Sequence, residues 1–185
     1  MEIDLLKFQT IIWLLPFALA FHEAEEWNIF RWYRRNFIDL PPERTKTTIR
    51  FFLVFLSFTG FIWTAIAFSW ENPTITAMIL FPLIALILQN IIQHIYWQFL
   101  FRQYAPGIVT SVVLLLPIVC WFLYWVVTKS EVPLWYIVVF GVLIIPGLIQ
   151  TVKVRNRLTS AIYSIHKFSL FAVRKIGLQK SVQPD

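Results

Sequence analysis

The sequence predicts an all-α fold, a polytopic membrane helix bundle of about five transmembrane helices plus a C-terminal amphipathic interfacial helix. The 185-residue chain is 58% hydrophobic but only 14% charged, and its mean hydropathy is +0.68. Soluble domains carry about 25% charged residues and could not bury this much apolar surface, whereas lipid can cover it. The chain also contains five apolar runs of about 20 residues, the length that crosses a bilayer core.

The five expected spans are separated by short links that favour turns. They cover residues 5–21 (helical as far as 27), 48–70, 74–101, 107–128 and 133–152. Glu71, Asn72 and Pro73 form a tight turn between the second and third spans, because proline fits the first turn of a helix. Trp and Tyr residues gather near the expected span ends, as in an interfacial aromatic belt.

The basic residues predict the orientation of the bundle. Of the 16 Lys and Arg residues, 14 fall in the link after the first span, the link after the third span and the tail after the fifth. With five spans these three segments share one side, and the positive-inside rule makes that side cytoplasmic. We therefore expect an integral protein of a bacterial cytoplasmic membrane, with its N-terminus outside and its C-terminus inside.

Residues 1–152 are expected to form the transmembrane bundle, and residues 153–185 a basic amphipathic cytoplasmic tail. The apolar residues of the tail recur at helical spacing, and its Lys and Arg side chains lie elsewhere on the helix. This pattern indicates an interfacial helix that contacts anionic lipid, although a sixth span is an alternative. The net charge of +6 is explained by orientation and lipid contact, so no nucleic-acid partner is expected.

The first span ends in a group of ionisable residues, His22-Glu23-Ala24-Glu25-Glu26. On a helix His22, Glu25 and Glu26 share about a third of the circumference, whereas Glu23 points elsewhere. A solvated helix end is one interpretation. However, acids at a helix C-terminus oppose the helix dipole, so three of them there also indicate a functional site.

A second polar group lies in the third span, where Asn90, Gln93 and His94 share a face with Trp97. Hydrogen bonding between helices would explain such residues, and so would a site in the bundle interior. In the predicted topology His22 lies roughly 25 Å and His94 roughly 30 Å from the outer side. The two groups therefore lie at similar depth, and two imidazoles with carboxylates could form a metal site.

The motif residues resemble a family of membrane proteins named for the sequence HXXEE. The match is His22 to Glu26, with Asn90 and His94 as a second element and Pro106-Gly107, followed by Thr110, as a third. The resemblance covers about residues 13–112 and implies site positions, but no activity. Pro106-Gly107 could equally be a helix-breaking turn. Arg102 and Tyr104 are interpreted as orientation and interface residues.

The first functional hypothesis is a membrane-embedded metal-binding protein. More specifically, it would be a hydrolase of a lipid or other amphiphile that enters from the cytoplasmic leaflet. His22, Glu26 and His94 would bind a divalent metal, with zinc favoured, and Glu25 would be the general base that takes a proton from the attacking water. The residues expected to contact substrate or to orient the ligands are Asn90, Gln93, Pro106 and Gly107.

Two other hypotheses stay open. The charged residues could form a proton or cation relay in a coupled transporter, which would need an oligomer because the short chain has no inverted repeat. The polar residues could instead stabilise a non-catalytic membrane protein that binds a partner. A homo-oligomer is compatible with each hypothesis.

Overall fold

The protein is an all-helical bundle, and the computed structural model describes residues 8–40 and 46–175. In this part of the chain, four helices are long and apolar enough to cross a membrane. They are α4 (Lys46–Phe68), α5 (Pro73–Phe101), the continuous helix Ile108–Lys129 and α8 (Leu134–Val154). The third of these comprises α6 (Ile108–Thr110), a π-helical segment η2 (Ser111–Leu115) and α7 (Leu116–Lys129).

The first expected span is helical but interrupted in the described residues, and it is not one of these four. Residues 8–12 are helical, Trp13 is a turn, and α2 (Leu14–Glu25) follows. The continuous helix expected over residues 5–27 is therefore wrong at this point, and the part before residue 8 lies outside the described residues. Pro16 explains the break, because it has no N–H to donate to the carbonyl of Ile12 and its ring crowds that carbonyl. After α2 the chain forms a 3₁₀ turn, η1 (Glu26–Asn28), and the short helix α3 (Ile29–Asn36).

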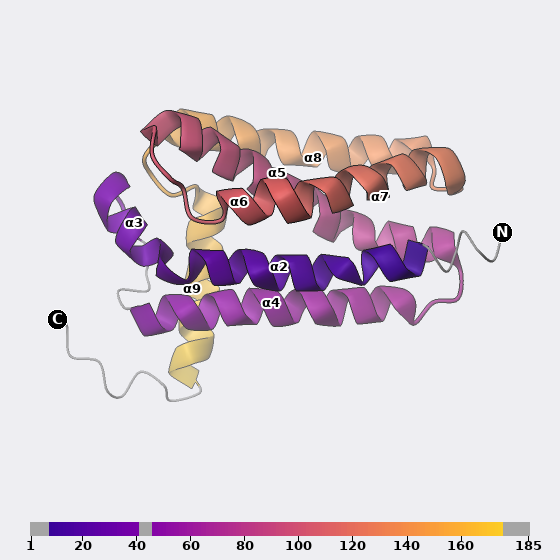
Figure 1. Ribbon diagram of the computed structural model, residues 1–185, viewed down its shortest axis with the longest axis horizontal. Helices are drawn as coiled ribbons and strands as arrows, with labels where there is room; N and C mark the ends of the chain where they lie inside the picture. The colour runs from indigo at the N-terminus through magenta and orange to yellow at the C-terminus, as the bar shows by residue number, and fades with distance from the viewer. Residues whose placement is uncertain (1–7, 41–45, 176–185) are drawn as a thin grey trace.

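The long helices lie side by side and alternate in direction (Figure 1). The helix α2 packs along α4, and α5 packs along α8 and against α7. As a result, α2 begins at one end of the bundle and α8 ends at the other (Figure 1). Fully buried apolar residues join these helices, among them Leu15 in α2, Ile84 in α5 and Phe122 in α7. This architecture is the membrane helix bundle that the composition predicts.

The link between α4 and α5 has the predicted turn chemistry. Pro73 is the first residue of α5, and the Asn72 side chain accepts hydrogen bonds from the backbone N–H groups of Thr74 at 2.9 Å and Ile75 at 3.2 Å. At its other end α5 stops at Arg102, which adopts the left-handed conformation with φ of 50°. This turn sends the chain back toward α2 and sets the path of residues 103–107.

The C-terminal helix α9 (Ser160–Lys175) crosses the bundle steeply instead of joining it (Figure 1). It packs against α4, where the rings of Phe52 and His166 have centroids 4.4 Å apart. Its 16 residues are fewer than the roughly 20 that a span needs. Phe168 and Phe171 are exposed on it, as expected of a helix lying at a lipid interface. The tail residues after 175 lie outside the described residues.

The arrangement of the helices supports a direct test of topology. A reporter fused after Asp185 is expected to be cytoplasmic and one fused before Met1 external, because most basic residues follow the first, third and fifth spans. Alkaline phosphatase, active outside, and green fluorescent protein, fluorescent inside, would give complementary readings at each end. Two termini on the same side would contradict the five-span topology.

Candidate metal centre

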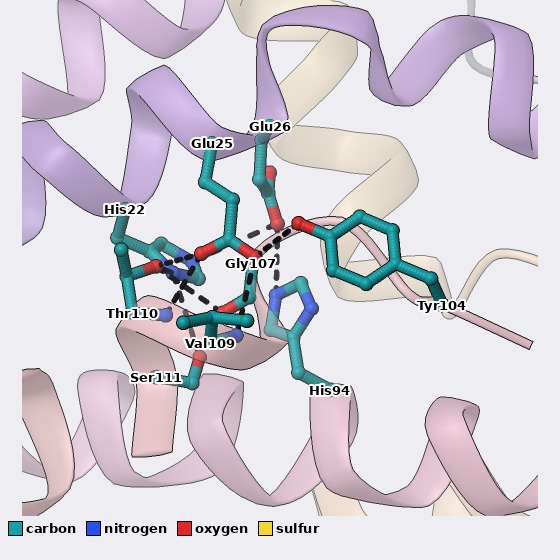
Figure 2. Close-up of polar contacts among 9 residues, drawn as sticks. All are labelled: His22, Glu25, Glu26, His94, Tyr104, Gly107, Val109, Thr110 and Ser111. Atoms are coloured by element: carbon teal, nitrogen blue, oxygen red, sulfur yellow. Dashed lines mark hydrogen bonds and ion pairs between the residues drawn. The ribbon is translucent and has the colours of Figure 1, made fainter. Parts of the chain in front are cut away.

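Three segments far apart in the sequence meet in one group of polar side chains (Figure 2). The C-terminal end of α2 and the turn η1 supply His22, Glu25 and Glu26. The last third of α5 supplies His94. The third segment runs from the link before α6 into η2 and carries Gly107 to Ser111. The sequence predicted the meeting of the first two segments from their matched depth, and the third completes the site.

His22, Glu26 and His94 form a buried cluster that could hold a metal ion. One ligand atom from each residue lies within 4.8 Å of the other two. Glu26 Oε1 lies 2.8 Å from His94 Nε2 and 3.6 Å from His22 Nε2. The two imidazole rings are nearly perpendicular, with centroids 4.9 Å apart (Figure 2). Two imidazoles and one carboxylate are ligands that zinc and other first-row metals accept.

The nitrogens that face the centre of the cluster are poorly satisfied by the protein. His22 Nε2 and His94 Nε2, which face the cluster, are buried without a hydrogen-bond partner among the described residues. His94 Nδ1, on the other side of its ring, has none among them either (Figure 2). The contact of His94 with Glu26 is short, but its direction does not meet hydrogen-bond geometry. Buried polar atoms normally have partners, so the two Nε2 atoms leave room for a ligand that accepts their lone pairs.

The other nitrogen of His22 is held by the third segment. His22 Nδ1 lies 3.1 Å from Thr110 Oγ1 and 3.4 Å from Ser111 Oγ. Thr110 Oγ1 donates its only proton to Glu25 Oε2, at 2.5 Å, so it can only accept from His22. His22 therefore carries its proton on Nδ1, and the lone pair of Nε2 faces Glu26 and His94. Metal-binding histidines are commonly oriented in this way through their second nitrogen.

Glu25 lies beside the cluster and its carboxylate accepts four hydrogen bonds (Figure 2). Two come from the backbone N–H groups of Val109 at 3.1 Å and Thr110 at 2.8 Å, in the first turn of the helix Ile108–Lys129. The others come from the hydroxyl of Thr110 and from that of Tyr104, at 2.5 Å. A carboxylate at a helix N-terminus satisfies unpaired N–H groups and complements the positive end of the helix dipole.

Tyr104 is a contributor that the sequence interpretation missed. It lies in the link between α5 and α6 and donates its hydroxyl proton to Glu25 Oε1. Burial, together with the neighbouring Glu25 carboxylate, raises the pKa of Tyr104 to about 12. The phenol therefore stays protonated, and able to donate, well beyond neutral pH. No sequence signal separates it from an ordinary interfacial tyrosine, because its role depends on the path of the link.

Gly107 closes the cluster from one side. Its φ of 89° lies in the left-handed region that favours glycine. A Cβ atom at this position would lie 2.7 Å from His22 Cε1, 2.8 Å from Glu26 Oε1 and 2.8 Å from His94 Cε1. The backbone of the third segment thus touches all three candidate ligands at once. A residue with a side chain could not occupy this place without moving them.

The remaining predicted site residues are Pro106, Gln93 and Asn90. Pro106 is buried directly before Gly107. Gln93 is buried and Asn90 half-buried on α5, but no hydrogen bond among the described residues connects either of them to the cluster. Their contact with substrate or ligands stays a prediction. Packing holds His94 in place, since its ring lies edge-on to that of Trp97 with centroids 5.3 Å apart.

The close approach of Gly107 predicts a sharp difference between two glycine variants. Gly107→Ala is expected to destabilise the protein by about 1–3 kcal/mol from backbone strain alone, with more from the clash with three side chains. Gly141→Ala is a matched control, because nothing lies within 4 Å of its added Cβ and alanine favours a helix. Thermal unfolding in detergent measures both. Equal melting temperatures for the two variants would contradict the close approach.

The comparisons with known proteins give a family but no relative of known activity. No match was found among curated proteins or among solved structures. A family model described as "Protein of unknown function with HXXEE motif" matches residues 13–122, more than half of the chain. That range contains every residue of the cluster and of its hydrogen-bond network. The chain therefore belongs to the family of membrane proteins with the HXXEE motif.

Proposed function

We propose that the protein is a membrane-embedded metal-binding protein in which His22, Glu26 and His94 hold a divalent ion. The observation that carries the proposal is the convergence of three buried ligand atoms within 4.8 Å of one another. Two further features support it. The inward-facing histidine nitrogens have no other partner among the described residues, and His22 has the tautomer that a ligand requires. Gly107 leaves the space that a side chain would otherwise fill.

The donor set also supports a catalytic role for the ion. Two histidines and one glutamate are the protein ligands of several catalytic zinc sites, in which one coordination position stays open. Zinc in such a site polarises a carbonyl or phosphoryl group of the substrate. We propose a hydrolase of a lipid or other amphiphile that enters from the cytoplasmic leaflet, because the cluster lies at the end of the bundle where most basic residues gather.

The hydrogen bonds of Glu25 support a positioning role better than the general-base role that the sequence predicts. Both carboxylate oxygens already accept two hydrogen bonds, so a proton transfer to Glu25 would disrupt the start of the helix Ile108–Lys129. In this proposal Glu25 fixes the hydroxyl of Thr110, which fixes the tautomer of His22. The general-base role stays a prediction, and the metal affinity of Glu25 and Thr110 variants distinguishes it from the positioning role.

One observation favours a second candidate, the proton or cation relay. Glu26 Oε1 and His94 Nε2 are only 2.8 Å apart, which is closer than two ligands of one tetrahedral zinc ion usually lie. A protonated imidazole beside the carboxylate would account for this distance without any metal. Bound metal would require the two side chains to move apart by a few tenths of an ångström. Metal content therefore separates the two candidates.

Metal analysis tests the proposal. Protein expressed in medium replete in zinc, iron and manganese and purified in detergent is expected to contain about one metal ion per chain. His94→Ala removes a ligand and is expected to lose this metal. His166→Ala is the control, because it removes a buried histidine of α9 that lies outside the cluster. Wild-type protein without stoichiometric metal would contradict the proposal and favour the relay.

Metal affinity of a second set of variants tests the role of Glu25. Glu25→Gln and Thr110→Val are each expected to weaken metal binding about 10- to 100-fold, as loss of a hydrogen bond that orients a metal ligand commonly does. Thr110→Ser keeps the hydroxyl and is expected to restore binding. Competition with a chromophoric chelator gives the affinities. Unchanged affinity in Glu25→Gln would reject the positioning role and leave the general-base prediction standing.

A further inference from the structure

A hollow lies beside the cluster, between η1 and α3 on one side and the start of α4 on the other. Its volume is about 680 Å³, large enough for the headgroup of a phospholipid. The residues that matter most for its chemistry are Trp27, Phe30, Arg31, Arg34, Arg35 and Lys46. The helix α3 lies at the end of the bundle where α4 begins (Figure 1). The hollow therefore opens at the level where the long helices end.

The hollow is strongly cationic. Three arginines of α3 and the lysine that begins α4 contribute to its walls, and all four side chains are exposed. Among the described residues, no carboxylate forms an ion pair with any of these four. Four positive charges gathered around one hollow repel one another unless an anion binds between them. Arginine has a planar fork of donors that matches the oxygens of a phosphate group.

The rest of the wall consists of three apolar residues and Asn28, and side-chain contacts hold it in place. Phe30 and Ile49 are buried side chains that line the hollow. The Trp27 ring lies under the guanidinium of Arg50, with the guanidinium carbon 4.9 Å from the ring centroid. Arg50 also donates to the Trp27 carbonyl at 3.4 Å and to Asn28 Oδ1 at 3.3 Å. A wall with cationic and apolar parts suits an amphiphile better than a free ion.

We propose that this hollow binds the phosphate headgroup of an anionic phospholipid. The arginines would hold the phosphate, and Trp27, Phe30 and Ile49 would contact the glycerol and the first acyl carbons. Basic residues with a tryptophan at the headgroup level are the usual features of an anionic lipid site. None of the residues that line this site belongs to the basic tail, where the sequence predicts anionic lipid. It needs no metal, so it is independent of the function proposed above.

Lipid binding in nanodiscs and native mass spectrometry tests the proposal. Wild-type protein in nanodiscs of phosphatidylcholine with a minor fraction of phosphatidylglycerol is expected to retain phosphatidylglycerol selectively. The triple variant Arg31→Gln, Arg34→Gln, Arg35→Gln is expected to lose about tenfold or more in that preference. The triple Lys variant of the same positions keeps the charge but loses the arginine fork, and should lose part of it.

The matched control changes the same number of charges outside the hollow. Lys153→Gln, Lys167→Gln, Lys175→Gln alters three exposed lysines of the last turn of α8 and of α9, none of which lines the hollow. Because the basic tail is expected to contact anionic lipid only through surface attraction, this variant should lose less of the preference than the arginine triple does. An equal loss in this control would overturn the proposal in favour of general surface attraction. Retention of the lipid by the arginine triple would overturn it as well, provided that the melting temperature shows a folded protein.

Two further arms separate the lipid from other sources of phosphate and from the metal site. Glycerol 3-phosphate and inorganic phosphate, added in solution, are expected not to displace the bound lipid at millimolar concentration. Displacement by either would mean that the hollow takes a soluble phosphate and would overturn the lipid assignment. His94→Ala keeps every residue that lines the hollow, so it should still prefer phosphatidylglycerol to phosphatidylcholine, and selective lipid binding can be tested without the metal.

Discussion

The site depends on the hydrogen bonds that the Glu25 carboxylate accepts. The carboxylate joins the C-terminal end of α2 to the N-terminal turn of the helix Ile108–Lys129 through four hydrogen bonds. Hydrogen bonds to a charged group contribute about 1.5–3 kcal/mol each, more than those between neutral groups. Gly107 immediately precedes that turn, so the same connection brings its backbone against the three candidate ligands. Without these hydrogen bonds, Thr110 would no longer be held against His22 Nδ1.

This connection also explains why three acids can end a helix whose dipole disfavours them there. Glu25 interacts unfavourably with the dipole of α2, at whose C-terminus it lies. Its favourable interaction with the N-terminus of the helix Ile108–Lys129 compensates for this. Glu26 turns inward through the 3₁₀ turn η1 and faces two imidazoles. Glu23 is buried with one carboxylate oxygen that has no partner among the described residues. The sequence shows the excess of acids but not where the compensating groups come from.

The sequence was sufficient to predict that His22 and His94 share a depth, because depth depends only on helix rise and on alternating direction. The bundle itself followed from composition and length. In the described residues its first span differs where Pro16 breaks the helix and where the α-helix ends at Glu25 in a 3₁₀ turn. The contacts of Tyr104 and Thr110 could not be predicted in the same way. These contacts depend on the left-handed turn at Arg102 and on the rotation of the next helix about its axis. The hydropathy of the sequence predicts neither of them.

The π-helical segment η2 is where that rotation is set. A single π turn adds a residue to the helix and shifts the faces of all residues that precede it relative to those that follow. Thr110 and Ser111 lie at its start and both hydroxyls reach His22 Nδ1. Leu115, at its other end, is fully buried in the apolar core. The segment therefore lets one helix turn polar groups to the cluster and apolar groups to the core.

The cluster and the cationic hollow share one short piece of backbone. Glu26 faces the histidines, while Trp27 and Asn28, its neighbours in the turn η1, line the hollow. The N–H of Ile29 donates to the Glu26 carbonyl, so Glu26, Trp27 and Asn28 form one hydrogen-bonded turn. A shift of Glu26 that widened its 2.8 Å contact with His94 would therefore also move the wall of the hollow. Any ligand that prefers one arrangement of η1 must, by reciprocity, change the affinity of the other site.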